Sequence, residues 1–330
     1  MALQLQGFNS KGNKTSNFRP QWWCRNKHFQ TLWPLVSRTY PRPSYRREKI
    51  RLYDDDFIDL DWLGPKSKNI PIVLVLHGLE GSSQSHYVRT LTNALEIRQV
   101  RSCVIHFRGC GGKINKKPRS YHGGETRDPT FIIKNIRRQY PDAPLFAVGY
   151  SLGASVLIKL LAELRDESIL RSAVAVAVPF ELRSTVKKLE RGSSRFYQYW
   201  LLKHMKNTVR SKKQLLENHI DIKKVLCART FHEFDDAGTA PVHGFRDAEE
   251  YYKNASCRKD LIKIRIPVLI LNSIDDPVTC ETSIPHAKEL GPNVVVELSR
   301  YGGHIGYVGS AISYEYGTWL DNKIIEYLNL

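Results

Sequence analysis

The sequence predicts an α/β fold in which a mostly parallel central sheet is flanked by helices. Three observations lead to this prediction. From residue 70 onwards, strand-sized apolar runs alternate with longer helix-like runs, a pattern typical of parallel sheets covered on both faces. The alternation stops near residue 180 and resumes near residue 263, which indicates an inserted segment. With 330 residues, 42% of them hydrophobic, the chain can bury a large core.

Residues 1–47 are expected to form an irregular arm packed on the core. Aromatic side chains supply its apolar anchors, at Trp22, Trp23, Phe29 and Trp33. Prolines are expected to interrupt any helix there, at Pro20, Pro34, Pro41 and Pro43. After the arm, two segments of alternating polarity, 47–53 and 57–62, flank the sequence Asp54-Asp55-Asp56. This pattern predicts a hairpin that leads into the sheet.

The first part of the core is expected over residues 48–179 and the second over 263–330. Four further strands are expected at 70–76, 102–107, 145–150 and 172–178, with helices at 87–98, 129–140 and 152–164. The second part contains strands at 267–272 and 294–298 and an amphipathic closing helix at 312–330. Residues 180–262 between the two parts are basic and aromatic. We interpret them as a helical cap inserted after the sixth strand.

The sequence Gly149-x-Ser151-x-Gly153 lies between the expected strand at 145–150 and the expected helix at 152–164. Small residues on both sides of the serine allow the strand and the helix to approach each other through a sharp turn. Such a turn presents its central side chain at the carboxyl edge of the sheet. The motif therefore predicts a nucleophile elbow with Ser151 as the nucleophile.

A serine hydroxyl becomes a good nucleophile when an imidazole takes its proton and an acid orients that imidazole. In folds with a nucleophile elbow, the three follow the chain order Ser, Asp, His. Downstream of Ser151, one expected strand runs into Asp275-Asp276-Pro277, and Tyr301-Gly-Gly-His304 follows the next strand. We assign His304 as general base and then acid. Asp276, directly before the proline, is assigned as the orienting carboxylate, with Asp275 as the alternative.

The oxyanion of a tetrahedral intermediate needs N–H donors that already point at it. We expect one from the backbone of Leu152, just after the nucleophile, and one from Leu79 in the loop after the strand at 70–76. His77 in that loop is expected to be structural. The run Gly78–Gly81 lacks the Gly-Lys-Ser/Thr ending of a phosphate-binding loop.

The formal net charge of +17 is compatible with binding to nucleic acid, with binding to an anionic membrane surface, or with a basic soluble protein. No zinc-finger spacing or aromatic RNA-binding motif accompanies the charge, so nucleic acid is not an expected partner. The basic residues of the cap form either a solvated helical face or a surface that attracts anionic lipid or an acidic substrate.

Six scattered cysteines without a C-x-x-C pair favour a reducing compartment. No apolar run approaches the ~20 residues of a membrane span, and the N-terminal residues lack the apolar core of a secretory signal. We therefore expect a cytoplasmic location, with peripheral contact to an anionic membrane surface left open. His232, Glu233, Asp235 and Asp236 stand close together in sequence, but without a second cluster they do not predict a metal site.

Taken together, six motifs resemble the bacterial esterases grouped as AB hydrolase superfamily 4 of the α/β-hydrolase superfamily. They are His77-Gly-Leu-Glu-Gly-Ser, His106-Phe-Arg-Gly-Cys-Gly-Gly, Tyr121-His-Gly-Gly-Glu-Thr, Gly149-Tyr-Ser-Leu-Gly, Glu233-Phe-Asp-Asp and Tyr301-Gly-Gly-His-Ile-Gly. Relatives of that family include animal abhydrolase-domain phospholipases and yeast medium-chain fatty-acid ester synthases. The resemblance implies an α/β-hydrolase fold, a triad at Ser151, Asp276 and His304, and no cofactor.

Our first hypothesis is a serine hydrolase that cleaves short- to medium-chain carboxylic esters, small molecules, through an acyl-enzyme. An acyltransferase or lipid-ester synthase, or a phospholipase, are alternatives, because any nucleophile that reaches the acyl-enzyme can resolve it. A hypothesis of another class is a non-catalytic adaptor that binds membranes or nucleic acid through its basic cap and retains a relict triad.

Overall fold

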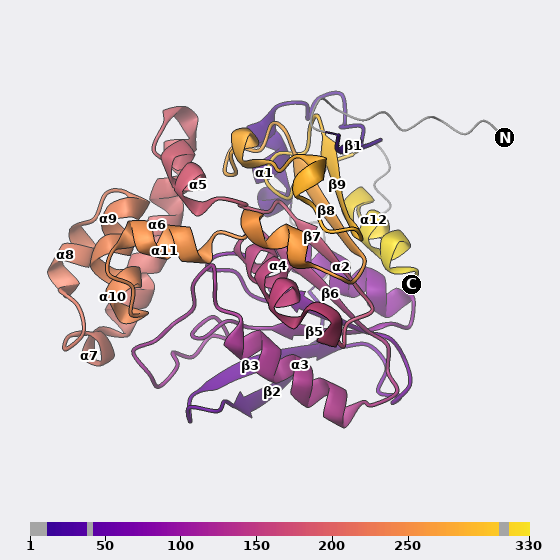
Figure 1. The fold of residues 1–330 in the computed structure, drawn as a ribbon, viewed down its shortest axis with the longest axis horizontal. Coiled ribbons are helices and arrows are strands. Elements are labelled where there is room, and N and C mark those ends of the chain that lie inside the picture. Colours follow the sequence, from indigo (N-terminus) through magenta and orange to yellow (C-terminus); the bar gives the residue numbers. More distant parts are fainter. Residues whose placement is uncertain (1–11, 38–41, 310–316) are drawn as a thin grey trace.

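The computed structural model describes residues 12–37, 42–309 and 317–330. Figure 1 shows a central sheet with helices on both faces and a group of helices displaced to one side. In the described residues the sheet has nine strands in the order β1-β9-β8-β7-β6-β4-β5-β3-β2. Strands β2, β3 and β5 pair antiparallel, and every other pair is parallel. The predicted α/β fold with a mostly parallel sheet is confirmed.

The strands are β1 (Lys14–Thr15), β2 (Arg46–Arg51), β3 (Phe57–Leu63), β4 (Ile72–Leu76), β5 (Arg101–Ile105), β6 (Leu145–Tyr150), β7 (Ser172–Val176), β8 (Val268–Ser273) and β9 (Val294–Ser299). The core helices are α1 (Lys27–Val36), α2 (His86–Ile97), α3 (Arg127–Gln139), α4 (Leu152–Leu164) and α12 (Trp319–Leu328). Between β7 and β8 lie α5 (Leu182–Leu189), α6 (Arg195–Ser211), α7 (Lys213–Leu216), α8 (Ile222–Cys227), α9 (Phe231–Phe234), α10 (Ala240–Val242) and α11 (Ala248–Ala255).

The hydrophobic core lies on both faces of the sheet. Successive residues of a strand point to opposite faces, so Leu74 of β4 packs with the cluster that includes Leu157 of α4, while Val73 and Val75 pack with Leu91 of α2. All five residues of β4 are buried. Burial on both faces explains why the parallel strands read as continuous apolar runs in the sequence.

Helices α5 to α11 pack around an apolar cluster of their own, with contributions from Leu182, Tyr197, Leu202, Phe231, Phe234 and Tyr252. Lys212, at the end of α6, anchors this cap to the core. Its buried Nζ donates to Asn115 Oδ1 at 2.9 Å, to the Pro118 carbonyl oxygen at 2.9 Å and to Ser120 Oγ at 2.8 Å. Burial lowers the pKa of Lys212 to about 8. The end of α6 is therefore attached to the loop that follows β5.

The N-terminal arm differs from the expectation that its prolines exclude a helix. Helix α1 is ten residues long and contains Pro34. An interior proline costs about 3 kcal/mol or more, but α1 ends only two residues later. The helix is capped by Asn26, whose Oδ1 accepts the N–H of His28 at 2.8 Å, and tertiary contacts bury Gln30 and Thr31. Packing on the core therefore overrides the local penalty.

Two other expectations differ in detail from the structure. The two-residue strand β1 pairs with β9, so among the described residues the cap follows the seventh strand rather than the sixth. A two-residue strand lies within the irregular arm and leaves no periodic signal in the sequence. The closing helix, expected over 312–330, is α12 from Trp319. Pro41 and residues 310–316 lie outside the described residues.

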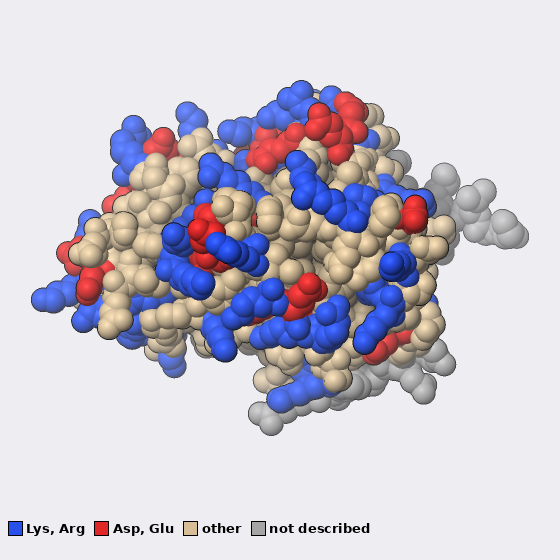
Figure 2. Space-filling model, turned by 90° about the horizontal axis from the view of Figure 1, so that it is seen from below, with Lys and Arg blue, Asp and Glu red and all other residues tan. Residues whose placement is uncertain are grey.

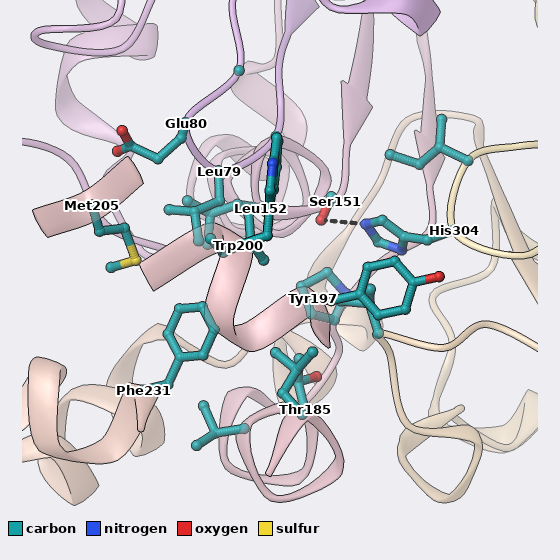
Figure 3. Close-up of a pocket in the computed structure, with 18 of the residues that line it drawn as sticks. Leu79, Glu80, Ser151, Leu152, Thr185, Tyr197, Trp200, Met205, Phe231 and His304 are labelled. Atoms are coloured by element: carbon teal, nitrogen blue, oxygen red, sulfur yellow. Dashed lines mark hydrogen bonds between the residues drawn. The ribbon is translucent and has the colours of Figure 1, made fainter. Parts of the chain in front are cut away.

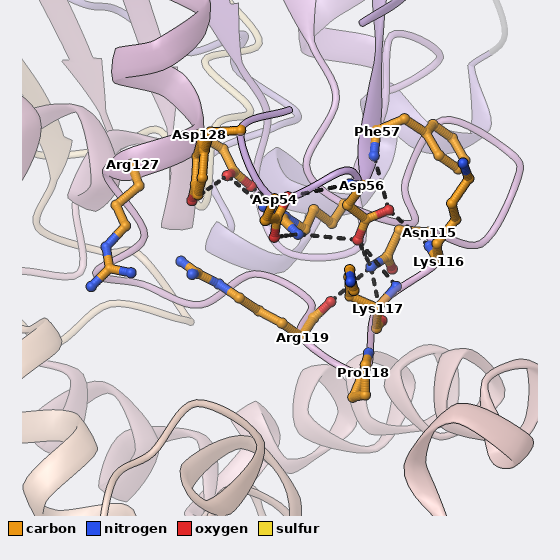
Figure 4. Close-up of polar contacts among 12 residues, drawn as sticks. Asp54, Asp56, Phe57, Asn115, Lys116, Lys117, Pro118, Arg119, Arg127 and Asp128 are labelled. Carbon is orange, nitrogen blue, oxygen red and sulfur yellow. Dashed lines mark hydrogen bonds and ion pairs between the residues drawn. The ribbon is translucent and has the colours of Figure 1, made fainter. Parts of the chain in front are cut away.

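The predicted hairpin is present, with β2 and β3 in antiparallel register. Its acidic turn also forms ion pairs with a buried arginine side chain. Arg108 is fully buried. Its Nη1 contacts Asp54 at 2.7 Å and Asp56 at 3.0 Å, while Nε and Nη2 contact the two oxygens of Asp128 at 2.6 Å and 2.8 Å. Figure 4 shows these carboxylates converging from the hairpin and from the start of α3. The network fixes the loop that follows β5.

Basic side chains are spread over the surface. Figure 2 shows Lys and Arg side chains across the whole face seen from below, with fewer acidic ones among them. The positive charge is therefore not confined to the cap. No helix in the described parts of the chain is both long enough and apolar enough to cross a membrane.

Candidate active site

Ser151 lies in the turn between β6 and α4, with φ 51° and ψ −118°. This left-handed backbone region is costly for a residue with a side chain. The surrounding packing requires glycine on both sides. A Cβ at Gly149 would lie 2.6 Å from the carbonyl oxygen of Gly153, and a Cβ at Gly153 would lie 2.5 Å from that of Leu76. The strained turn is the local geometry that Gly149-x-Ser151-x-Gly153 predicts.

The structure brings Ser151, His304 and Asp276 into one chain of hydrogen bonds. His304 Nε2 lies 3.0 Å from Ser151 Oγ, and His304 Nδ1 lies 2.9 Å from Asp276 Oδ2. Figure 3 shows the imidazole pointing at the serine hydroxyl. The other oxygen of Asp276 accepts the backbone N–H of Val278 at 2.7 Å and of Thr279 at 3.1 Å. These bonds fix the carboxylate so that its Oδ2 faces Nδ1 of the imidazole.

Asp275, the alternative acid, has a different position. Its Oδ1 accepts the N–H of Gly303 at 3.0 Å, and in the described residues its Oδ2 is buried without a hydrogen-bond partner. Burial raises the pKa of this carboxyl group. Ser273 Oγ reaches the same turn by donating to the carbonyl oxygen of Gly303 at 2.5 Å. Asp275 therefore supports the turn that carries His304, and the imidazole contacts Asp276.

Residues of the arm, which the sequence analysis did not connect with the site, hold the loop around His304. Thr31 Oγ1 accepts the backbone N–H of His304 at 3.0 Å. The side-chain amide of Gln30 accepts the backbone N–H of Val308 at 2.7 Å and donates to the carbonyl oxygen of Val308 at 3.1 Å. These contacts join residues more than 270 positions apart, so no local sequence signal could indicate them.

The cap supports the acidic end of the same hydrogen-bond chain. Lys188 of α5 donates to the carbonyl oxygens of Asp276 at 2.6 Å and Thr279 at 2.8 Å. Ser194 Oγ donates to the carbonyl oxygen of Pro277 at 2.6 Å. The turn 276–279 is thus held from the cap, and the turn at His304 is held from the arm.

Leu79 and Leu152, whose backbone N–H groups the sequence predicts as oxyanion donors, line the same cavity as Ser151. Within the described part of the chain, neither N–H has a hydrogen-bond acceptor. The loop around Leu79 is fixed by its neighbours. The N–H of Gly78 donates to Tyr87 Oη at 3.0 Å, and Glu80 accepts from Tyr121 Oη at 3.0 Å and from Thr208 Oγ1 of α6 at 2.8 Å. Glu80 therefore connects this loop to the cap.

Ser151 and His304 open into a cavity of about 490 Å³, within the usual range for ligand pockets of about 300–1,000 Å³. The core contributes Leu79 and Leu152, and the arm contributes Leu32 and Leu35. Most of the remaining wall is apolar and comes from the cap, with Leu182, Val186, Leu189, Phe196, Tyr197, Trp200, Leu201, Met205, Phe231 and Tyr252. Figure 3 shows Trp200, Met205 and Phe231 facing the cavity.

His77 is buried, and the ring nitrogens of His86 are buried as well. Burial lowers the pKa of His77 to about 3 and that of His86 to about 4. His77 Nε2 accepts the N–H of Phe107 at 3.2 Å, which agrees with a structural role. Both ring nitrogens of His86, which lines the cavity, lack a partner in the described residues. Both rings are uncharged at neutral pH. The described residues also contain no group of three or more His, Cys, Asp or Glu side chains that could hold a metal ion.

Comparison with known proteins identifies the family. Residues 71–310 match the family described as alpha/beta hydrolase fold. The chain belongs to the alpha/beta hydrolase family. The resemblance inferred from the sequence motifs is thereby confirmed, as is the predicted fold class.

Relatives of this hydrolase carry esterase and lipase names. It is 35% identical to the protein named "Putative esterase YheT" of Escherichia coli strain K12, over 96% of this chain and 94% of the relative. It is 31% identical to Phospholipase ABHD3 of Bos taurus, over 89% of this chain and 74% of that one. It is 33% identical to a monoacylglycerol lipase of Saccharomyces cerevisiae, over 72% and 55% of the two chains.

Solved structures share the fold at lower sequence identity. An esterase of Pyrococcus furiosus aligns with a TM-score of 0.55 at 16% identity, over 87% of this chain and 90% of that chain. A putative aryl esterase of Burkholderia cenocepacia aligns with a TM-score of 0.52 at 20% identity, over 86% and 100% of the two chains. At these identities the likeness supports the fold alone.

Proposed function

We propose that this hydrolase cleaves carboxylic esters with Ser151 as nucleophile, His304 as general base and then acid, and Asp276 as the orienting carboxylate. That the protein is a carboxylic ester hydrolase in the general sense follows from its family and its esterase- and lipase-named relatives. The observation that carries the finer proposal is the hydrogen-bond chain Ser151–His304–Asp276 at the wall of an apolar cavity.

In the acylation step, Ser151 Oγ attacks the ester carbonyl carbon while its proton passes to His304 Nε2. Asp276 holds the Nδ1–H of the imidazole and stabilises the imidazolium that forms. The N–H groups of Leu79 and Leu152 donate to the developing oxyanion, a contribution of about 10²–10³ in rate for each such donor. The alcohol then leaves with the proton from Nε2, and the acyl group remains on Ser151.

In the second step a nucleophile resolves the acyl-enzyme. A water molecule loses a proton to His304 Nε2 and attacks the acyl carbonyl carbon, and Ser151 leaves as it regains its proton. The carboxylic acid and the free enzyme result. An alcohol in place of water would give acyl transfer with the same groups.

The cavity supports esters with short- to medium-length acyl chains as substrates. Its walls are largely leucine and aromatic side chains, which favour an alkyl chain by removing apolar surface from water. The relatives named phospholipase and monoacylglycerol lipase support esters of lipids as the substrate class. We therefore propose lipid esters with acyl chains that fit beneath the cap.

Turnover of p-nitrophenyl esters by Ser151→Ala and by the matched variant Ser155→Ala tests the proposal. Ser155 is one turn further along α4 and is fully buried. We expect Ser151→Ala to lose at least about 10⁴-fold in kcat and Ser155→Ala to keep activity within an order of magnitude. A series of acyl lengths should show a maximum at short to medium chains. Undiminished turnover by Ser151→Ala would show that Ser151 is not the nucleophile.

Fluorophosphonate labelling separates the enzyme from a non-catalytic adaptor. A folded wild-type protein with the proposed mechanism is labelled at Ser151, and Ser151→Ala is not. A folded wild-type protein without labelling would instead support the adaptor. Comparing ester formation with hydrolysis at rising alcohol concentration distinguishes an acyltransferase from a hydrolase.

A further inference from the structure

Two helices beside the cavity expose large apolar side chains in stripes. On α1 the stripe is Phe29, Trp33 and Val36, with spacing i, i+4, i+7, which places them on one face of the helix. On α6 the stripe is Phe196, Tyr199 and Trp200. The exposed fraction reaches 65% at Val36 and 69% at Tyr199. A helix packed on a globular core normally turns such a stripe inward.

The two stripes lie next to each other in the fold. His28 of α1 and Tyr197 of α6 share a hydrogen bond of 2.9 Å between Nδ1 and Oη, and their rings stack. Just before α1, Trp22 is 79% exposed, and Trp23 packs edge-on against Trp33 with ring centroids 5.0 Å apart. We use the name aromatic rim for this set: Trp22, Trp23, Phe29, Trp33, Val36, Phe196, Tyr199 and Trp200.

The cavity that contains Ser151 opens within the aromatic rim. Phe196 and Trp200 belong to the rim and also line the cavity, and Leu35 between the two stripes is both exposed and part of the cavity wall. A molecule that enters between α1 and α6 therefore meets aromatic side chains before it reaches the Ser151 hydroxyl. Exposed residues of the rim thus form part of the cavity wall.

The segments that carry the rim are basic and contain no acidic residue. Neither residues 12–37 nor residues 191–213 include Asp or Glu. Exposed basic side chains flank the stripes, among them Arg19, Arg25, Arg195 and Lys203. The face seen in Figure 2 is basic as well, so the charge alone does not select a docking face. The rim is selected because exposed aromatic groups, positive charge and the cavity entrance coincide there.

We propose that the aromatic rim docks this hydrolase onto an anionic lipid bilayer, so that ester substrates enter the cavity from the lipid side. Entry of substrate from the lipid side rests on the proposed function, whereas the docking does not. Trp and Tyr side chains favour the bilayer interface, and a helix with an outward apolar face can lie in the plane of that interface. Basic residues add attraction to anionic headgroups. A second copy of the chain does not complement the rim, because both surfaces would be positive.

Vesicle cosedimentation tests the docking. The Ser151→Ala protein, which should leave lipids intact, is mixed with vesicles of phosphatidylcholine alone or with added phosphatidylglycerol. We expect strong binding to the anionic vesicles, weak binding to the neutral ones, and loss of binding at high salt. Equal binding to both vesicle types would contradict the electrostatic part. No binding to anionic vesicles at low salt would overturn the proposal and leave the proposed function untouched.

Paired variants locate the docking surface. Trp22→Ser, Phe29→Ser and Tyr199→Ser remove exposed rim side chains that do not line the cavity, and together they should weaken vesicle binding at least about tenfold. Ile114→Ser and Ile262→Ser, exposed elsewhere, are the matched controls and should bind like the parent. Equal losses in both sets would show that the rim is not the docking surface.

A second pair tests the charges in the same way. Arg195→Gln with Lys203→Gln on α6 should weaken binding by about fivefold per residue, whereas Lys134→Gln with Arg138→Gln, exposed on α3, should have a smaller effect. In a protein that keeps Ser151, the substitutions Trp22→Ser, Phe29→Ser and Tyr199→Ser should leave hydrolysis of a soluble p-nitrophenyl ester as in the wild type. The same protein should lose activity on an ester embedded in anionic vesicles. If sedimentation shows a wild-type dimer that these variants dissociate, the rim is a contact between copies and the proposal is wrong.

Discussion

Thr31 Oγ1 accepts the backbone N–H of His304 at 3.0 Å and donates to the carbonyl oxygen of Lys27 at 2.8 Å. The first described helix therefore holds the loop that carries the proposed general base, across 273 positions of the chain. Gly303, with φ 55°, makes the turn that brings the two together. The arm is consequently part of the framework of the site.

Thr31→Val keeps the shape of the side chain and removes its oxygen, so the N–H of His304 loses its acceptor. We expect kcat for a soluble ester to fall about fivefold, as the loss of a hydrogen bond worth ~1 kcal/mol would suggest, with little change in KM. Thr31→Ser, which keeps the oxygen, should restore most of the rate. If Thr31→Ser falls as far as Thr31→Val, lost packing is responsible instead.

Asp276→Asn and Asp275→Asn should separate the two neighbouring acids. The amide in place of Asp276 cannot hold the imidazole in the required tautomer, and we expect kcat to fall by about 10⁴-fold. Asp275→Asn changes a group that contacts the N–H of Gly303 and does not contact the imidazole, so a smaller loss, below about 10²-fold, is expected. Steady-state kinetics of both variants check the assignment. The reverse order would make Asp275 the orienting acid.

Gly153→Ala should destabilise the protein by about 1–3 kcal/mol or more, because the new methyl group would lie 2.5 Å from the carbonyl oxygen of Leu76. Gly192→Ala is the matched comparison. Gly192 has φ 52° but has no atom within 4 Å of a built Cβ, so only backbone strain of about 1 kcal/mol is expected. Urea unfolding of both variants measures the difference. Equal costs would mean that crowding at the elbow is relieved by movement of α4.

Arg108→Met should be among the most damaging substitutions outside the site. It leaves the carboxylates of Asp54, Asp56 and Asp128 without their shared cation, and breaking a buried ion network costs about 3–5 kcal/mol. Arg51→Met is the control, since Arg51 pairs with Asp55 of the same hairpin on the surface, where a pair contributes about 0–1 kcal/mol. Thermal or urea unfolding should rank the two variants clearly. A small loss for Arg108→Met would contradict the ion network.

Asp235 should make stability depend on pH. Burial raises its pKa to about 6, although Thr239 Oγ1 and Tyr252 Oη both donate to the carboxylate, at 2.6 Å and 2.8 Å. Because the folded-state pKa is raised, the contribution is fully present below about pH 4 and is lost as the pH rises through 6.

The comparison with Asp235→Asn isolates this contribution. Subtracting the unfolding free energy of Asp235→Asn from that of the wild type should give a difference that falls by about 3 kcal/mol between pH 4 and pH 7. Urea titrations at several pH values give this difference. A flat difference would mean that Asp235 is ionised throughout.

The order of core strands and helices, the elbow at Ser151 and the positions of Asp276 and His304 after successive strands were predictable from the sequence. The reason is that these features depend on local rules. Burial on both faces of a parallel sheet imposes continuous apolar runs, a tight strand-to-helix turn demands small residues at 149 and 153, and the carboxyl ends of parallel strands meet at one edge.

Only the tertiary structure decided which acid meets His304, because Asp275 and Asp276 are adjacent and share the same local pattern. It also decided that α1 forms despite Pro34, that Thr31 holds the His304 loop and that Asp54 and Asp56 bind Arg108. Each of these features depends on atoms brought together from distant parts of the chain. Their energies come from packing and hydrogen bonds that a periodicity in the sequence does not record. The shape of the cavity beneath the cap likewise depends on contacts between distant parts of the chain.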